Sequence, residues 1–293
     1  MREGVVVKAC GGFFYVKEGD KVWECFLRGK LRKQGERILV GDRVRFRESD
    51  RERGVVEEVL PRRLALVRPP VANVDQVIIV FAVADPDPNI SLLDRLLVQV
   101  GHAGPEAVIC FNKADLEGED PYRLRDIYQR AGYKFLITST VTGQGIDELA
   151  ETLKNRITVF AGPSGAGKSS LLNALNPGWQ LKTGEVSAKI GRGRHTTRHV
   201  ELLELKEGGF VADTPGFSSL YLPEIAPEEL AAYFPEFSEP AQECRFTSCL
   251  HHREPDCGVK KAVEEGQIPS SRYRNYLAFL EELREMEERR YRE

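Results

Sequence analysis

The sequence has 293 residues, of which 41% are apolar and 30% charged, and its formal net charge is −3. This composition excludes a disordered or fibrous chain and predicts a globular protein with more than one domain. The longest purely apolar run, residues 77–84, is too short to span a membrane, and the first residues lack a signal-peptide pattern, so we expect a cytoplasmic protein.

Residues 1–68 are basic and contain short runs of β-type sequence. They hold 17 Lys and Arg against 11 Asp and Glu, whereas the rest of the chain holds 25 against 34. Five such runs, several of them separated by Gly-containing turns, predict a small β-barrel of the OB-fold type. A basic barrel on an acidic body suggests a polyanionic partner such as RNA. Residues 60–70, with their prolines and positive charges, read as a linker.

Residues 72–222 alternate between apolar strands and amphipathic helices. This alternation predicts an α/β domain with a parallel sheet covered by helices. The expected strands are 74–84, 106–112, 134–139, 156–162, 199–205 and 209–214, and the expected helices are 90–101, 121–132, 145–155 and 168–175.

A phosphate-binding loop is predicted at residues 162–169, which read GPSGAGKS between an expected strand and an expected helix. Glycines let the backbone N–H groups turn toward phosphate oxygens, and the helix N-terminus adds positive potential. Lys168 would bridge the β- and γ-phosphates as a catalytic group, and Ser169 would bind Mg²⁺. The residues expected to contact the nucleotide here are Gly162, Pro163, Ser164, Gly165, Ala166, Gly167, Lys168, Ser169 and Ser170.

A second phosphate-side motif, DTPG, follows the last expected strand. Asp213 would lie at the C-terminal end of that strand and complete the Mg²⁺ shell, and the N–H of Gly216 would face the γ-phosphate. Between the two motifs, residues 183–199 are Gly-rich and charged, as in a switch loop that the γ-phosphate and Mg²⁺ order. There Thr196 or Thr197 would offer a hydroxyl to the metal ion, although ordinary loop residues are an alternative.

A guanine-binding motif is predicted in NKAD, which follows another expected strand. The carboxylate of Asp115 can accept from N1–H and the exocyclic amine of guanine together, a donor pair that adenine lacks. Lys113 would cover the base, and Asn112 would tie this loop to the phosphate loop. Ser139, at the end of a further strand, and nearby backbone N–H groups would contact O6 of the base.

The base motif precedes the phosphate motif, which is the reverse of the usual order in GTPases. Because the site is three-dimensional, a chain cut in one loop and joined in another keeps every strand in place. A circularly permuted GTPase domain is therefore favoured. Two alternatives stay open: an ATP-dependent enzyme in which NKAD is accidental, and an RNA-binding assembly protein with a vestigial nucleotide site.

A cysteine-rich segment near the C-terminus predicts a closed, structural zinc site. Its spacing is C-x₄-C-x-H-x₅-C, with His252 as a rival ligand and reduced buried thiols as the alternative. A long amphipathic helix ends the chain. The expected ligands are Cys244, Cys249, His251 and Cys257.

These pieces together resemble the RsgA (YjeQ) family, the circularly permuted GTPases that depend on the small ribosomal subunit. The resemblance rests on the small barrel, FNKAD, GPSGAGKSSLLNAL, GRGRHTT, DTPGF and CRFTSCLHHREPDC, and it spans nearly the whole chain. It implies an OB-fold in residues 1–68, a permuted Ras-like domain in 72–222 and a zinc domain in 223–293. It also implies one structural Zn²⁺, with His251 as a ligand, and GTP hydrolysis during late maturation of the small subunit.

The residue that would orient the attacking water is the least defined part of the predicted site. Phe217 follows DTPG, where many GTPases place a glutamine, and it cannot orient water by hydrogen bonding. His195 in the expected switch is our candidate, supported by the resemblance, and an exposed loop histidine without a role is the alternative. Arg198 stands where the family pattern suggests a third threonine, which leaves the choice of metal-binding threonine open. We expect a monomer that binds GTP, GDP and rRNA, without a membrane partner.

Overall fold

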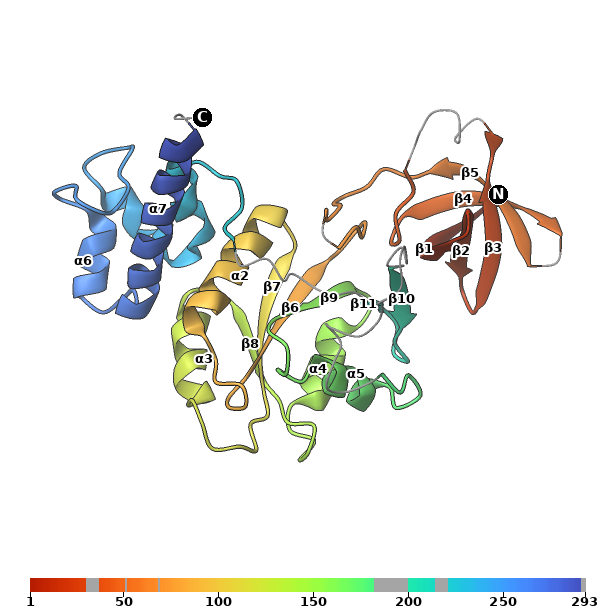
Figure 1. Ribbon diagram of the computed structural model, residues 1–293, viewed down its shortest axis with the longest axis horizontal. Helices are drawn as coiled ribbons and strands as arrows, with labels where there is room; N and C mark the ends of the chain where they lie inside the picture. The colour runs from red at the N-terminus through yellow and green to blue at the C-terminus, as the bar shows by residue number, and fades with distance from the viewer. Residues whose placement is uncertain (30–36, 51, 68, 182–199, 214–220, 291–293) are drawn as a thin grey trace.

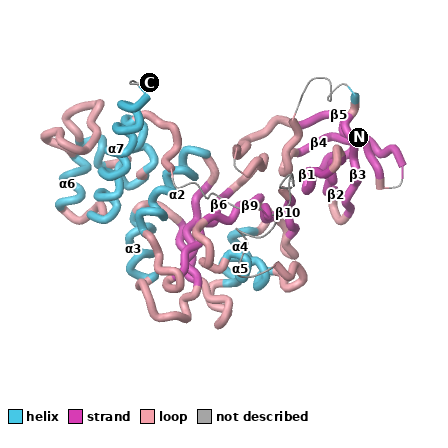
Figure 2. The backbone as a smooth tube through the Cα atoms, in the orientation of Figure 1, coloured by secondary structure: helices cyan, strands magenta, loops and turns pink. Residues whose placement is uncertain are grey.

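The computed structural model describes residues 1–29, 37–50, 52–67, 69–181, 200–213 and 221–290 of the chain. Figure 1 shows three units in a row: a barrel of N-terminal strands at one end, a sheet with helices in the middle, and the C-terminal helices at the other end. Figure 2 shows the same order by secondary structure, from mostly strand to mostly helix. Among the described residues, no helix is long and apolar enough to cross a membrane.

The N-terminal unit is a closed five-stranded barrel. Strand β1 pairs with β2 and β4, β3 pairs with β2 and β5, and β4 pairs with β5, so the ring of hydrogen-bonded strands closes. Side chains alternate along each strand: on β4, Val44 and Phe46 are buried in the barrel core whereas Arg43 and Arg47 are exposed. The OB-type barrel predicted from the sequence is thus confirmed. Its strands are β1 (Arg2–Cys10), β2 (Phe13–Glu18), β3 (Lys21–Leu27), β4 (Arg43–Asp50) and β5 (Arg53–Val59).

The central unit is an α/β sheet in which β9, β6, β7 and β8 are parallel neighbours. Alternate residues of β6 enter two different cores: Ile79 and Phe81 pack with α2 and α3, and Ile78 and Val80 pack with α4 and α5. The strands are β6 (Gln76–Ala82), β7 (Glu106–Asn112), β8 (Lys134–Ile137), β9 (Ile157–Ala161), β10 (Glu201–Glu204) and β11 (Phe210–Asp213), and the helices are α2 (Ile90–Ala103), α3 (Pro121–Arg130), α4 (Ile146–Leu153) and α5 (Lys168–Leu175).

One strand departs from the predicted parallel arrangement. β11 is parallel to β9, but β10 is antiparallel to β11. The reason is local: a tight turn with Gly208 and Gly209 at positive φ joins the two strands directly, and strands joined by a hairpin must run in opposite directions. β10 also pairs with β1 at Lys8 and Glu201, so the barrel and the central sheet share one continuous run of strands.

The C-terminal unit is mainly helical, as predicted. The long helix α7 buries Tyr276, Leu280 and Leu283 in a core that also receives Val98 from α2 of the central unit. Figure 1 shows α7 beside α2. Its elements are the 3₁₀ helices η1 (Pro227–Tyr233), η2 (Pro235–Phe237) and η3 (Pro240–Glu243), followed by α6 (Gly258–Glu264) and α7 (Ser270–Arg290).

Candidate functional site

The predicted phosphate and base motifs lie at the same edge of the central sheet. β9 ends at Ala161, just before the phosphate loop, and β7 ends at Asn112, the first residue of the base motif. Both strands pair in parallel with β6, which lies between them. Ligands of open α/β sheets bind outside the carboxyl ends of the strands. The two motifs, 50 residues apart in the chain, therefore face one site.

The phosphate loop has a shape that requires glycine. Gly162, Gly165 and Gly167 all have positive φ, at 119°, 82° and 92°. A Cβ on Gly162 would lie 2.1 Å from the carbonyl oxygen of Val80, and one on Gly167 would lie 2.2 Å from Nδ2 of Asn112. The loop leads into α5, which begins at Lys168. Backbone N–H groups of a glycine-rich loop and a helix N-terminus together suit an anion, as the sequence predicts for this loop.

Lys168 lies folded inside the phosphate loop. Its Nζ donates hydrogen bonds to the carbonyl oxygens of Gly162 at 2.8 Å and Pro163 at 2.7 Å. Burial lowers the pKa of Lys168 to about 8 because it disfavours the charged ammonium. A γ-phosphate brought to this loop would restore a strong partner for that charge.

Asn112 connects the base loop with the phosphate loop, as predicted. Its Nδ2 donates to the carbonyl oxygen of Ala166 at 3.1 Å, and its Oδ1 accepts from the hydroxyl of Thr138 at 3.1 Å. Asn112 and Thr138 are almost completely buried, so these bonds fix the amide. Sequence reasoning missed Thr138. Its position directly before Ser139, at the end of β8, was the available signal.

Asp115 and Ser139 are joined by a hydrogen bond between their side chains. The hydroxyl of Ser139 donates to Oδ1 of Asp115 and accepts from the backbone N–H groups of Val141 and Thr142, each at 3.2 Å. Ser139 is buried, and its hydrogen bonds orient the Asp115 carboxylate at the mouth of the site. Contact of Ser139 with O6 of the base stays a prediction. In this structure the Ser139 hydroxyl donates to Asp115.

A loop after β6 also borders the site. Nζ of Lys113 donates to the backbone carbonyl of Asp85 and lies 3.9 Å from the Asp85 carboxylate. A Cβ on Gly165 in the phosphate loop would lie 3.2 Å from Pro86. Asp85 and Pro86 of this loop, residues 83–89, therefore lie beside the base motif and the phosphate loop respectively. Sequence reasoning gave this loop no role, because it carries no nucleotide-binding motif.

Part of the predicted site lies outside the described residues. His195, Thr196, Thr197 and Gly216 belong to this part, as does Phe217. The backbone of Asp213 ends β11, which is parallel to β9, and it therefore reaches the same edge of the sheet as the phosphate loop. The other expected nucleotide contacts of the phosphate loop, Pro163, Ser164, Ser169 and Ser170, lie at partly or fully exposed positions.

The predicted metal ligands converge in the C-terminal unit. The ligand atoms of Cys244, Cys249, His251 and Cys257 all lie within 4.8 Å of one another. The Cys244 and Cys257 sulfurs are 3.8 Å apart, and each is 3.5 Å from Nδ1 of His251. A tetrahedral zinc ion with Zn–S bonds of about 2.3 Å and a Zn–N bond of about 2.0–2.1 Å would give nearly these separations. The cluster can therefore hold a metal ion.

The surrounding hydrogen bonds favour His251 over His252 as the ligand. Tyr273 and Tyr276 of α7 donate to the backbone carbonyls of His251 at 2.6 Å and Leu250 at 2.8 Å, which holds this turn against the helix. His252 turns away, with Nδ1 at 3.3 Å from the Arg284 guanidinium.

Comparison with known proteins decides the family. The model of the RsgA GTPase family matches residues 59–223, and that of the RsgA N-terminal domain matches residues 3–56. The chain belongs to the RsgA GTPase family. RsgA GTPases hydrolyse GTP, so the chain is an enzyme of this class, and GTP is used with Mg²⁺.

Full-length relatives support the assignment to the RsgA family. The small ribosomal subunit biogenesis GTPase RsgA of Moorella thermoacetica is 54% identical over 281 residues, covering 96% of this chain and 97% of that protein. The protein of the same name from Geobacillus sp. WCH70 is 50% identical and covers 99% and 100%.

Solved structures of similar proteins share the whole RsgA-type architecture. YjeQ from Thermotoga maritima superposes with a TM-score of 0.85 at 43% identity, covering 96% of this chain and 98% of that one. YloQ, described as a circularly permuted GTPase, gives a TM-score of 0.83 at 38% identity, covering 98% and 96%. The permuted GTPase fold predicted from the reversed motif order is confirmed.

Proposed function

We propose that this GTPase acts in ribosome biogenesis by binding the small ribosomal subunit and hydrolysing GTP during late subunit maturation. The observation that supports the proposal is the hydrogen bond from Asn112 to Ala166, which joins the base motif to the phosphate motif. In this proposal the two motifs form one guanine-nucleotide site. The names of the full-length relatives supply the biological context, since they describe small ribosomal subunit biogenesis GTPases.

The reaction in this proposal is attack of water on the γ-phosphate of GTP. The phosphate loop and Lys168 hold the β- and γ-phosphates, and Asp115, oriented by Ser139, selects guanine. Ser169 and Asp213 would hold Mg²⁺, which neutralises charge on the phosphates. Phe217 cannot orient the attacking water, so His195 of the switch segment supplies that group, and turnover stays slow until the subunit brings it into place.

The two flanking units have binding and scaffolding roles in this proposal. Cys244, Cys249, His251 and Cys257 hold one structural Zn²⁺, which fits their separations and leaves no open coordination position. The basic barrel contacts rRNA, as its excess of positive charge favours. The protein works as a monomer in the cytoplasm. The division into residues 1–68, 72–222 and 223–293 stays part of the proposal.

Co-sedimentation with purified ribosomal subunits tests the binding step. Small subunits should retain the protein in the presence of a non-hydrolysable GTP analogue and release it in the presence of GDP. Large subunits should retain it in neither case, which is the matched control. Equal retention by both subunits, or retention independent of the nucleotide, would refute the proposal.

A further inference from the structure

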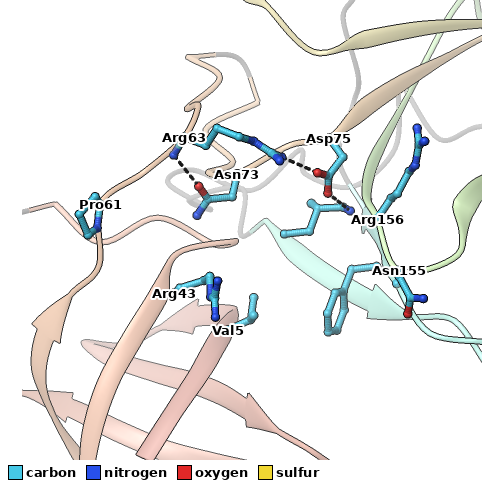
Figure 3. Close-up of a pocket in the computed structure, with 11 residues that line it drawn as sticks. Val5, Arg43, Pro61, Arg63, Asn73, Asp75, Asn155 and Arg156 are labelled. Carbon is cyan, nitrogen blue, oxygen red and sulfur yellow. Dashed lines mark hydrogen bonds and ion pairs between the residues drawn. The ribbon is translucent and has the colours of Figure 1, made fainter.

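A pocket of about 520 Å³ lies between the barrel and the base of the central sheet, lined in part by Arg43 and Arg156 (Figure 3). Its lining carboxylate, Asp75, accepts from the Arg63 guanidinium with one oxygen and from the N–H of Ile157 at 2.7 Å with the other. Figure 3 shows these bonds, which fasten the linker to the start of β9. A second carboxylate fastens a loop in the same way, and that loop carries the candidate metal ligands.

The carboxylate of Glu254 bonds to the backbone on both sides of His251. Its Oε1 accepts from the N–H of Leu250 at 3.0 Å, and its Oε2 accepts from the N–H of His252 at 2.9 Å. Burial alone would raise the pKa of Glu254, but hydrogen bonds from backbone N–H groups, including these two, lower it below its usual value. The charged carboxylate therefore spans the turn that carries His251.

The backbone of His251 has a conformation that its surroundings must hold. Its φ is +54°, in the left-handed region that residues other than glycine adopt infrequently. Its N–H donates to Sγ of Cys249 at 3.4 Å, and its carbonyl accepts from the Tyr273 hydroxyl. These bonds join His251 to another candidate ligand and to α7, whereas Glu254 fixes the neighbours on either side of it.

The imidazole ring of His251 depends on this turn for its direction. Its Nδ1 lies 3.5 Å from the sulfurs of both Cys244 and Cys257. The other ring nitrogen of a metal-binding histidine usually bonds to a carboxylate or carbonyl, which fixes the ring. Among the described residues none bonds to Nε2 of His251, and the ring packs edge-on against Phe237 at 5.8 Å between centroids. The turn and this aromatic packing therefore set the direction of Nδ1.

Another carboxylate near the ligands offers a matched comparison. Glu243 directly precedes Cys244, but its side chain is 68% exposed and lies 3.7 Å from Lys261 of α6. It adds negative charge beside the cluster without bonding to the turn. The two glutamates thus differ in what they hold in place and share their charge.

We propose that Glu254 is the residue that positions His251 for metal binding. The inference rests on the zinc site of the proposed function and deepens it. Both oxygens of Glu254 already accept hydrogen bonds, so its role is to position a ligand and not to be one. A histidine that is turned toward the three thiols before the metal arrives lowers the entropic cost of binding.

The test is the affinity of the full-length protein for Zn²⁺, measured by competition with a chromogenic chelator. Glu254→Ala should raise the Kd by about 10- to 100-fold, as loss of a residue that orients a ligand does. Glu254→Gln keeps one acceptor oxygen and should give a smaller increase. Glu243→Ala is the matched control and should leave the Kd unchanged. A parental Kd in Glu254→Ala, or equal weakening in Glu243→Ala, would overturn the inference.

A second readout separates positioning from general stabilisation of the loop. Co²⁺ bound at the same ligands absorbs visible light, and its spectrum reports the geometry of those ligands. At saturating Co²⁺ the spectrum of Glu254→Ala should differ from that of the parent, and the spectrum of Glu243→Ala should not. A parental spectrum in Glu254→Ala would overturn the positioning role.

The parent protein distinguishes failure of this inference from failure of the zinc site itself. A parent that binds no Zn²⁺ would refute the proposed zinc site and the inference with it. A parent that binds Zn²⁺, together with unchanged affinity and spectrum in Glu254→Ala, would refute this inference alone.

Discussion

Arg272 on α7 and Asp94 on α2 form a buried salt bridge, with Nη1 and Oδ1 2.6 Å apart and at most 1% of either side chain exposed. Tyr128 and Asn275 also donate to this carboxylate, at 2.7 and 2.6 Å, and Arg272 donates to Glu236 at 2.7 Å. Burial alone would lower the pKa of Arg272, but the two carboxylates raise it well above its usual value. The C-terminal unit is thus fixed to the helix that follows the site-bordering loop 83–89.

Arg272→Met should detach α7 from α2, because it leaves two buried carboxylates without a cation. Removal of one partner from a buried pair costs about 3–5 kcal/mol. Hydrogen exchange at the backbone amides of α7 measures this loss of protection. The control is Arg289→Met, whose side chain is 77% exposed and pairs with Glu285 at 3.4 Å. Equal protection of α7 in both variants would contradict the role of the buried pair.

GTP affinity should depend on pH through Lys168. The pKa of this lysine is about 8 without nucleotide, and the phosphates of GTP favour the charged form. GTP binding therefore takes up a proton above this pKa, and affinity falls by about tenfold per pH unit there. Titration calorimetry over this pH range measures both quantities. Lys168→Gln should bind weakly without this pH dependence; a flat profile in the parent would place the lysine pKa elsewhere.

Asp115→Asn should weaken GTP binding and make xanthosine triphosphate the better ligand. The amide of asparagine can donate to the xanthine carbonyl that replaces the exocyclic amine of guanine. Competition binding with the two nucleotides measures the change. Ser139→Ala should lower GTP affinity without altering the base preference, since it keeps the Asp115 carboxylate but removes the hydroxyl that orients it and that accepts from Val141 and Thr142. Unchanged guanine preference in Asp115→Asn would remove Asp115 from the site.

Metal analysis should find about one Zn²⁺ per chain, as four ligands in a closed site predict. Cys249→Ser should release the metal and loosen the turn that Tyr273 and Tyr276 hold against α7. Metal content and hydrogen exchange at α7 are the two readouts. His252→Ala is the control and should keep its zinc. Loss of zinc in His252→Ala with retention in Cys249→Ser would show that the ligand set is wrong.

The site motifs could be predicted from the sequence because each is a local pattern. The glycines of the phosphate loop, NKAD and the Cys/His spacing each lie within a short segment next to a strand or helix. The reversed order of the motifs even indicated the permuted topology. Local patterns of this kind can be recognised in a sequence without any knowledge of the tertiary contacts.

The long-range pairings could not be predicted in the same way. Asp94 and Arg272 are 178 residues apart, and a charged residue in an amphipathic helix normally faces water. The antiparallel direction of β10 follows instead from the short Gly208–Gly209 turn that joins it to β11, a local signal that the sequence analysis did not use. The pocket lined by Arg43 and Arg156 exists only because the barrel packs beside the sheet. For the ion pair and the pocket, tertiary packing and not local sequence decides the outcome.

The most direct test of the proposed function is the rate of GTP hydrolysis with small subunits, with large subunits and with neither. The parent protein should be slow alone and accelerate by on the order of tenfold or more with small subunits only. His195→Ala should keep GTP-dependent binding to small subunits but lose most of this acceleration. A parent rate that is the same in all three conditions would contradict the account.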